Sequence, residues 1–177
     1  MRVESRMSRT PPPELRWFNT AYVAAEDRLR LACALKSGGS EIVWLTRRIS
    51  DALIRQLLDW LDRVTPSDSR VGDLAHRMAQ QAAMAKTQPR PVGTIPDAPG
   101  WVARSVGYNL AARGVMLTFL GDGGRAVRVQ FDADHLRRWL KVLQVQYRRS
   151  GWPLDLWPAW IREEETEPGQ VPSEMLH

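Results

Sequence analysis

Three side chains that can exchange protons or bind a metal ion stand close together in the second half of the chain. They are Asp132, Asp134 and His135, at the start of a segment with a helical pattern of apolar residues. A carboxylate beside an imidazole could support acid–base chemistry or hold a metal ion. The same residues are typical of a helix start, because an aspartate there accepts hydrogen bonds from unpaired backbone N–H groups. No second histidine lies at ligand spacing, since His76 is remote and His177 is the last residue. We therefore favour helix capping and predict neither a metal site nor a catalytic residue.

Two other features resemble a cofactor-binding or reactive site in residue type, but the neighbouring sequence does not fit such a site. The stretch Gly121-Asp-Gly-Gly-Arg-Ala126 fits the dinucleotide fingerprint G-x-G-x-x-A, which requires a helix directly after the glycines. A strand pattern over 127–131 follows instead, which predicts a hairpin turn. Cys33 is the only cysteine and lies between two apolar positions, which favours a small core residue. We predict no disulfide and no cofactor.

The basic residues gather on two segments with helical patterns. The first, 46–64, carries Arg47, Arg48, Arg55 and Arg63, but its aspartates favour a solvated helix face with ion pairs. The second has no acidic residue over 137–149 and carries five cations, namely Arg137, Arg138, Lys141, Arg148 and Arg149. Cations clustered in this way can bind the phosphates of a nucleic acid, or they can form a solvated helix face, and both interpretations stay open.

Tryptophan residues form the second candidate binding feature. Trp44 alternates with inward-facing residues, which directs its side chain outward as a platform on which a base could stack. Trp152, Trp157 and Trp160 lie in a short segment with two prolines, which excludes a regular helix throughout. Two interpretations of this segment stay open. It is a strap that closes the core, or it is an exposed anchor for a partner or a second subunit, since tryptophan dominates binding hot spots.

The hydrophobic pattern predicts that two β-β-β-α units position these residues. Apolar residues alternate along strands between 15 and 45, and again between 102 and 131, where the first strand is predicted over 102–110. A helical pattern follows each set. The units match without a gap at an offset of 86 positions, at which Leu29 falls on Val115 and Val43 on Val129. We predict an α+β fold in which two pseudo-repeated units pack as one domain, with antiparallel sheets, helices on one face and a connecting helix.

The composition is that of a globular chain with a basic body. Of 177 residues, 44% are hydrophobic and 25% are charged, and the net charge is +5. Residues 162–177 hold five glutamates and one arginine, which predicts an acidic disordered tail. We predict a flexible leader at 1–13 and a single domain at 14–161. Its half-repeats, 14–65 and 101–150, are joined by a helix and proline-rich linker at 66–100. No apolar run is long enough for a bilayer or a signal peptide, so we expect a cytoplasmic protein that binds no membrane.

These features together predict a non-catalytic protein that binds nucleic acid, single-stranded or without strong sequence preference. The contacts would come from the five cations of 137–149 and from Trp44. In layout, the predicted fold resembles small duplicated nucleic-acid-binding modules that pair a curved sheet with a helix. The alternative is a protein-interaction or assembly factor that binds a partner, or itself as a homodimer, through the tryptophan-rich segment 152–161.

Overall fold

A computed structural model describes residues 10–66, 72–86 and 99–162, and the structural statements below concern these ranges. The predictions of a flexible leader at 1–13, a proline-rich linker and an acidic tail fall mostly or wholly on 1–9, 67–71, 87–98 and 163–177. These residues lie outside the described part of the chain.

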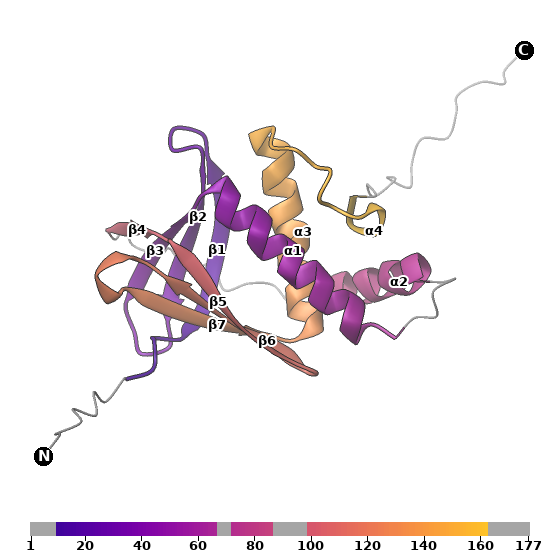
Figure 1. Cartoon of the computed structure of the whole chain (residues 1–177), viewed down its shortest axis with the longest axis horizontal. Helices are drawn as coiled ribbons and strands as arrows, with labels where there is room; N and C mark the ends of the chain where they lie inside the picture. Colours follow the sequence, from indigo (N-terminus) through magenta and orange to yellow (C-terminus); the bar gives the residue numbers. More distant parts are fainter. Residues whose placement is uncertain (1–9, 67–71, 87–98, 163–177) are drawn as a thin grey trace, which may run out of the picture.

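The elements follow the order that the hydrophobic pattern predicts, except that two strands replace the single strand predicted over 102–110. The first unit consists of β1 (Leu15–Val23), β2 (Arg28–Leu35), β3 (Ser40–Leu45) and α1 (Arg47–Val64), and α2 (Gly72–Ala85) follows it. The second unit consists of β4 (Gly100–Val102), β5 (Ser105–Ala111), β6 (Gly114–Leu120), β7 (Ala126–Phe131) and α3 (Ala133–Ser150), before the short α4 (Ala159–Arg162). The helices pack against the strands (Figure 1), so the α+β class is confirmed.

Local sequence signals explain where these elements begin and end. The side chains of Thr46 and Asp132 cap α1 and α3, each by accepting a hydrogen bond from the backbone N–H three residues on. Gly151, with φ 71°, ends α3 in the left-handed conformation that glycine adopts without strain. Gly123 and Gly124 also have positive φ, and they turn the chain between β6 and β7 through a single 3-10 turn. The glycine motif is therefore a hairpin turn.

The strands form a four-stranded sheet, β1-β2-β3-β4, and a three-stranded sheet, β5-β6-β7. The sequence pattern predicts one strand from 102 to 110, but the chain changes sheets there. The N–H of Ala103 donates to Trp44 O, and the N–H of Arg104 donates to Leu120 O in the other sheet. The pairing is antiparallel as expected, except that β4 runs parallel to β3. Figure 1 shows β4 continuing into β5 across the gap between the sheets.

The pairing registers of the two units correspond closely. Leu29 pairs with Leu45 in the first unit and Val115 with Phe131 in the second, both at the offset of 86. The parallel pair Ile42–Gly100 has its counterpart at the same offset in an isolated bridge between Arg128 and Glu14. Descent of the two units from a duplication stays a prediction.

α1 and α3 each pack on the sheet of the other unit. The indole N–H of Trp139 on α3 donates to Thr20 Oγ1 on β1 at 3.0 Å, and that of Trp60 on α1 donates to Ala111 O on β5 at 2.9 Å. One cluster of buried side chains, including Leu29, Leu61 and Leu117, joins both units. None of the described helices combines the length and apolar character that a membrane span requires.

Candidate binding groove

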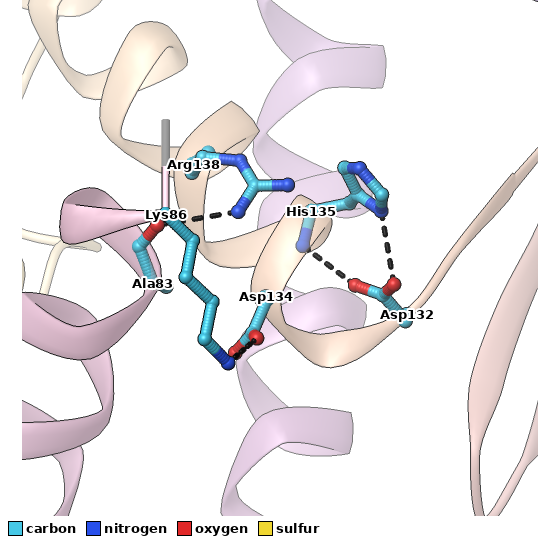
Figure 2. A network of polar contacts seen from close by, with 6 residues as sticks. All are labelled: Ala83, Lys86, Asp132, Asp134, His135 and Arg138. Carbon is cyan, nitrogen blue, oxygen red and sulfur yellow. Dashed lines mark hydrogen bonds and ion pairs between the residues drawn. The ribbon is translucent and has the colours of Figure 1, made fainter. Parts of the chain in front are cut away.

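Asp132, Asp134 and His135 belong to a polar network at the first turn of α3 (Figure 2). Asp132 accepts the backbone N–H of His135 at 2.7 Å through one carboxylate oxygen, and its other oxygen lies 3.0 Å from His135 Nδ1. Partial burial acts to raise the pKa of Asp132, but the backbone N–H and the side chain of His135 and the charge of Arg138 hold that pKa below its usual value. The pair thus has the geometry of a helix cap.

The same network joins α3 to the end of α2. The Lys86 ammonium lies 2.7 Å from Asp134 Oδ2, and Arg138 donates to Ala83 O at 3.2 Å. Figure 2 shows both contacts reaching from α3 to the last turn of α2. Among the described residues, no three His, Cys, Asp or Glu side chains are grouped so that they could hold a metal ion.

These residues border a groove of about 1210 Å³ beside the first turns of α3. We call it the α3 groove. The start of β1, the end of β7 and the end of α2 supply its walls. The turns after β2 and β5 add one cation each. Its charged lining consists of Arg16, Lys36, Lys86, Arg113 and Arg138 against Glu14, Asp132 and Asp134.

Three of the five cations in the α3 groove, Arg16, Arg113 and Arg138, form no ion pair with a described residue. Lys36 is bound to Glu14, and Lys86 to Asp134. Arg16 and Arg113 are exposed, and neither has an ion-pair partner among the described residues. The groove therefore has a net positive charge, with two guanidinium groups available to an anion.

The floor of the α3 groove consists of aromatic rings that pack on one another. Phe131 stacks on Trp139 with ring centroids 5.0 Å apart, and the edge of Phe18 meets Trp139 at 5.4 Å. Trp17, half-buried on the edge strand β1, also lines the groove and takes part in no ring pair among the described aromatic residues. Its indole face is therefore the one suited to stacking on a base.

The position of Arg137 corrects the prediction that it contacts phosphates. Its side chain is 2% exposed and extends from α3 toward His76 of α2 and Trp160 of α4. The guanidinium donates to Thr65 Oγ1 at 2.8 Å and lies over the ring of Trp160, 5.1 Å from the centroid. Burial lowers the pKa of Arg137 from its usual value. A buried cation with these partners ties helices together and is not accessible to a ligand.

The other four predicted cations do not form one surface. Arg138 lines the α3 groove, whereas Lys141 donates to Ile161 O at 3.0 Å and so holds α4. Arg148 and Arg149 are exposed in the last turn of α3. At 1.5 Å per residue, they lie about 15 Å along the helix from Arg138. The structure brings only Arg138 of the predicted set to the groove.

Trp44 lies on the outer face of the first sheet, as predicted, but it is half-buried. Gly100 of β4 faces its indole so closely that an added Cβ would lie 2.3 Å from Trp44 Nε1. Arg30 is its partner across the strand pair β2–β3. β4 thus covers part of the Trp44 indole, which the sequence predicts to stack on a base.

The three tryptophans of segment 152–161 are interior residues, and this corrects the prediction that they bind a partner. Trp152, Trp157 and Trp160 are 6%, 1% and 6% exposed. Trp152 donates to Asp27 Oδ1 at 3.0 Å, and the edge of the Trp157 ring meets Tyr147 at 5.4 Å. The segment is a strap laid over the core, which is the first of the two interpretations that the sequence leaves open.

Cys33 is fully buried in the core, as predicted. Burial, together with the charge of Glu41, raises the pKa of its thiol to about 12. A thiol with so high a pKa is a poor nucleophile at neutral pH.

Sequence reasoning missed most of the lining of the α3 groove. Arg16, Lys36, Lys86 and Arg113 are single cations on separate strands, turns and helix ends, and Trp17 is an ordinary strand residue. A charge pattern within one helix was the only signal available, and these residues show none. Comparisons with protein-family models, curated proteins and solved structures found no match for this chain.

Proposed function

We propose that the protein binds single-stranded nucleic acid in the α3 groove, without catalysis. The observation that supports this proposal is the convergence of five cations from separate elements around an aromatic floor, with Arg16 and Arg113 unpaired by any described residue. Phosphates would meet these two arginines and Arg138, and a base would stack on Trp17.

The aromatic lining favours a single strand over a duplex. Stacking on an indole requires an exposed base face, which a paired base does not offer. Because Trp152, Trp157 and Trp160 are buried, we favour this proposal over the alternative, a protein-interaction factor that binds through these residues. We further propose that this binding takes place in the cytoplasm, a reducing compartment compatible with a lone thiol.

Fluorescence anisotropy with labelled single-stranded DNA, single-stranded RNA and duplex DNA, at about 50 and 200 mM salt, tests the proposal. We expect a single strand to bind more tightly than the duplex. Its affinity should fall steeply with salt, because phosphate contacts release counterions. No binding at the lower salt concentration, or binding that is insensitive to salt, would contradict the proposal.

A pair of double variants locates the binding surface. Arg16→Gln with Arg113→Gln removes two exposed cations of the α3 groove that form no ion pair with a described residue, and Arg55→Gln with Arg63→Gln removes two exposed cations of α1 outside it. Both changes lower the net charge by two. Only the groove variant should weaken binding and reduce the salt slope, by about one per lost phosphate contact. Equal losses in both variants would indicate a nonspecific charge effect.

A further inference from the structure

His76 of α2 lies where α1, α2, α3 and α4 meet, and it is 5% exposed. Its Nε2 is 3.0 Å from Asp62 Oδ1 on α1, and its Nδ1 is 3.1 Å from a guanidinium nitrogen of Arg137 on α3. Its ring stacks on Trp160 of α4, with centroids 4.8 Å apart. One imidazole thus joins three other elements to α2.

These contacts determine which nitrogen of the neutral His76 ring carries the proton. A guanidinium can only donate hydrogen bonds, so His76 Nδ1 must accept one and carry no proton. The proton of the neutral ring therefore sits on Nε2 and is donated to Asp62. A second proton would have to go onto Nδ1, where it would remove the acceptor of Arg137 and place two positive charges about 3 Å apart.

The charged groups around His76 act in opposite directions. Burial and the charge of Arg137 disfavour a second proton, whereas Asp62 and Asp73 favour it. α4 presents the uncharged ring of Trp160, and its Arg162 lines a pocket together with Asp62. The first two effects prevail, so the pKa of His76 lies below its usual value.

Few side chains of α2 are buried, although Arg138 and the Lys86–Asp134 ion pair also join its end to α3. Its buried residues are His76, Gln80 and Ala83, and its outward residues Leu74 and Met78 are 52% and 62% exposed. Gln80 donates to Arg137 O at 3.2 Å. A helix attached through so few side chains is released at a lower free energy than the core helices are.

We propose that protonation of His76 releases α2 from α3. The release also removes Met84 and Lys86 from the wall of the α3 groove, which they line from the end of α2. The consequence for nucleic-acid binding rests on the proposed function of the groove, whereas the release itself does not.

Hydrogen exchange of the full chain at pH 7.5 and 5.5, corrected for intrinsic exchange rates, tests the release. We expect the protection of α2 amides to fall by up to about tenfold at pH 5.5, because an unperturbed histidine has a pKa near 6.5. The amides of β6 serve as the internal reference and should keep their protection. A parallel loss in β6, or no loss in α2, would overturn the proposal.

Two histidine variants assign the effect. In His76→Gln the amide can accept from Arg137 and donate to Asp62 but does not titrate, so the pH response of α2 should disappear. His135→Gln changes the exposed histidine of the groove and should keep the wild-type response. A response that persists in His76→Gln would contradict our assignment.

Proton NMR of the wild-type protein provides a second test that does not depend on a variant. The His76 ring should titrate below the usual value, and the shifts of α2 amides should follow the same midpoint. A midpoint at or above about 6.5 would rule out the proposed device.

Anisotropy with the single strand at both pH values then separates the two proposals. Weaker binding at pH 5.5 in wild type, but not in His76→Gln, would support coupling of the release to the groove. Equal binding at both values while α2 exchange changes would refute that coupling. No binding at either value would overturn the proposed function and leave the release intact.

Discussion

Arg137 and Arg138 are consecutive residues of one type in opposite environments. Successive residues of a helix point about 100° apart. Arg138 therefore reaches the α3 groove, while Arg137 lies under α2 and Trp160. α3 is in fact buried on two sides, since Gln144, seven residues after Arg137, is 1% exposed. The residues on this second buried side are polar. The spacing of apolar residues along α3 therefore could not show that this side is buried.

We expect Arg137→Ala to lower the free energy of unfolding by about 2–3 kcal/mol, because it removes buried hydrogen bonds and packing on Trp160. Arg149→Ala, in the exposed last turn of α3, is the matched control and should stay within about 0.5 kcal/mol of wild type. Denaturation with urea measures both. Wild-type stability in Arg137→Ala together with weaker oligonucleotide binding would instead restore the prediction that Arg137 contacts phosphates.

At the scale of elements, the strap after α3 closes the core, although its composition is also typical of an exposed binding segment. It begins at Gly151, and its indoles fill space between α3 and α4 and the turn that holds Asp27. Tryptophan, proline and a nearby acidic run are equally typical of an exposed binding segment. Only the burial of the three indoles distinguishes the two cases.

Trp157→Ala should destabilise the protein by about 3–5 kcal/mol, since a large, fully buried ring is lost and a cavity remains against Tyr147. Trp157→Phe keeps an aromatic ring and should cost clearly less. Thermal and urea denaturation report the difference. A Trp157→Ala variant as stable as wild type would mean that the strap is not part of the core.

At the scale of the whole molecule, the exchange of helices makes each unit dependent on the other. α1 packs on β5 and α3 on β1, and the indole N–H bonds of Trp60 and Trp139 cross between the units in both directions. Without the helix of the other unit, each small sheet would expose part of its apolar face to water, which is unfavourable. The two units should therefore fold only together.

We expect fragments 1–86 and 87–177 to be unfolded separately and to regain structure when mixed. Circular dichroism and dispersion of amide NMR signals measure this, with the intact chain as reference. The cut leaves each described helix and strand whole. A fragment that gave native-like dispersed signals alone would contradict the dependence of the units on each other.

The sequence by itself determined the local features of this protein. Period-two alternation, the caps Thr46 and Asp132, and the glycine turn after β6 specify the order of elements and the hairpin, because they act between residues close in the chain. Because these signals act only between residues close in the chain, they also led to a wrong prediction over 102–110. The pattern over 102–110 is that of one strand, and the exchange of partners at Ala103 depends on two sheets meeting in space.

The tertiary structure alone decided which side chains act together. The α3 groove takes Arg16 from β1, Arg113 from a turn and Lys86 from the end of α2, and none of these belongs to a run or a periodic pattern. Likewise, Arg137 is buried because His76 and Trp160, far from it in the sequence, pack against its guanidinium. Contacts between distant segments leave no local pattern, so charge and periodicity could not predict them.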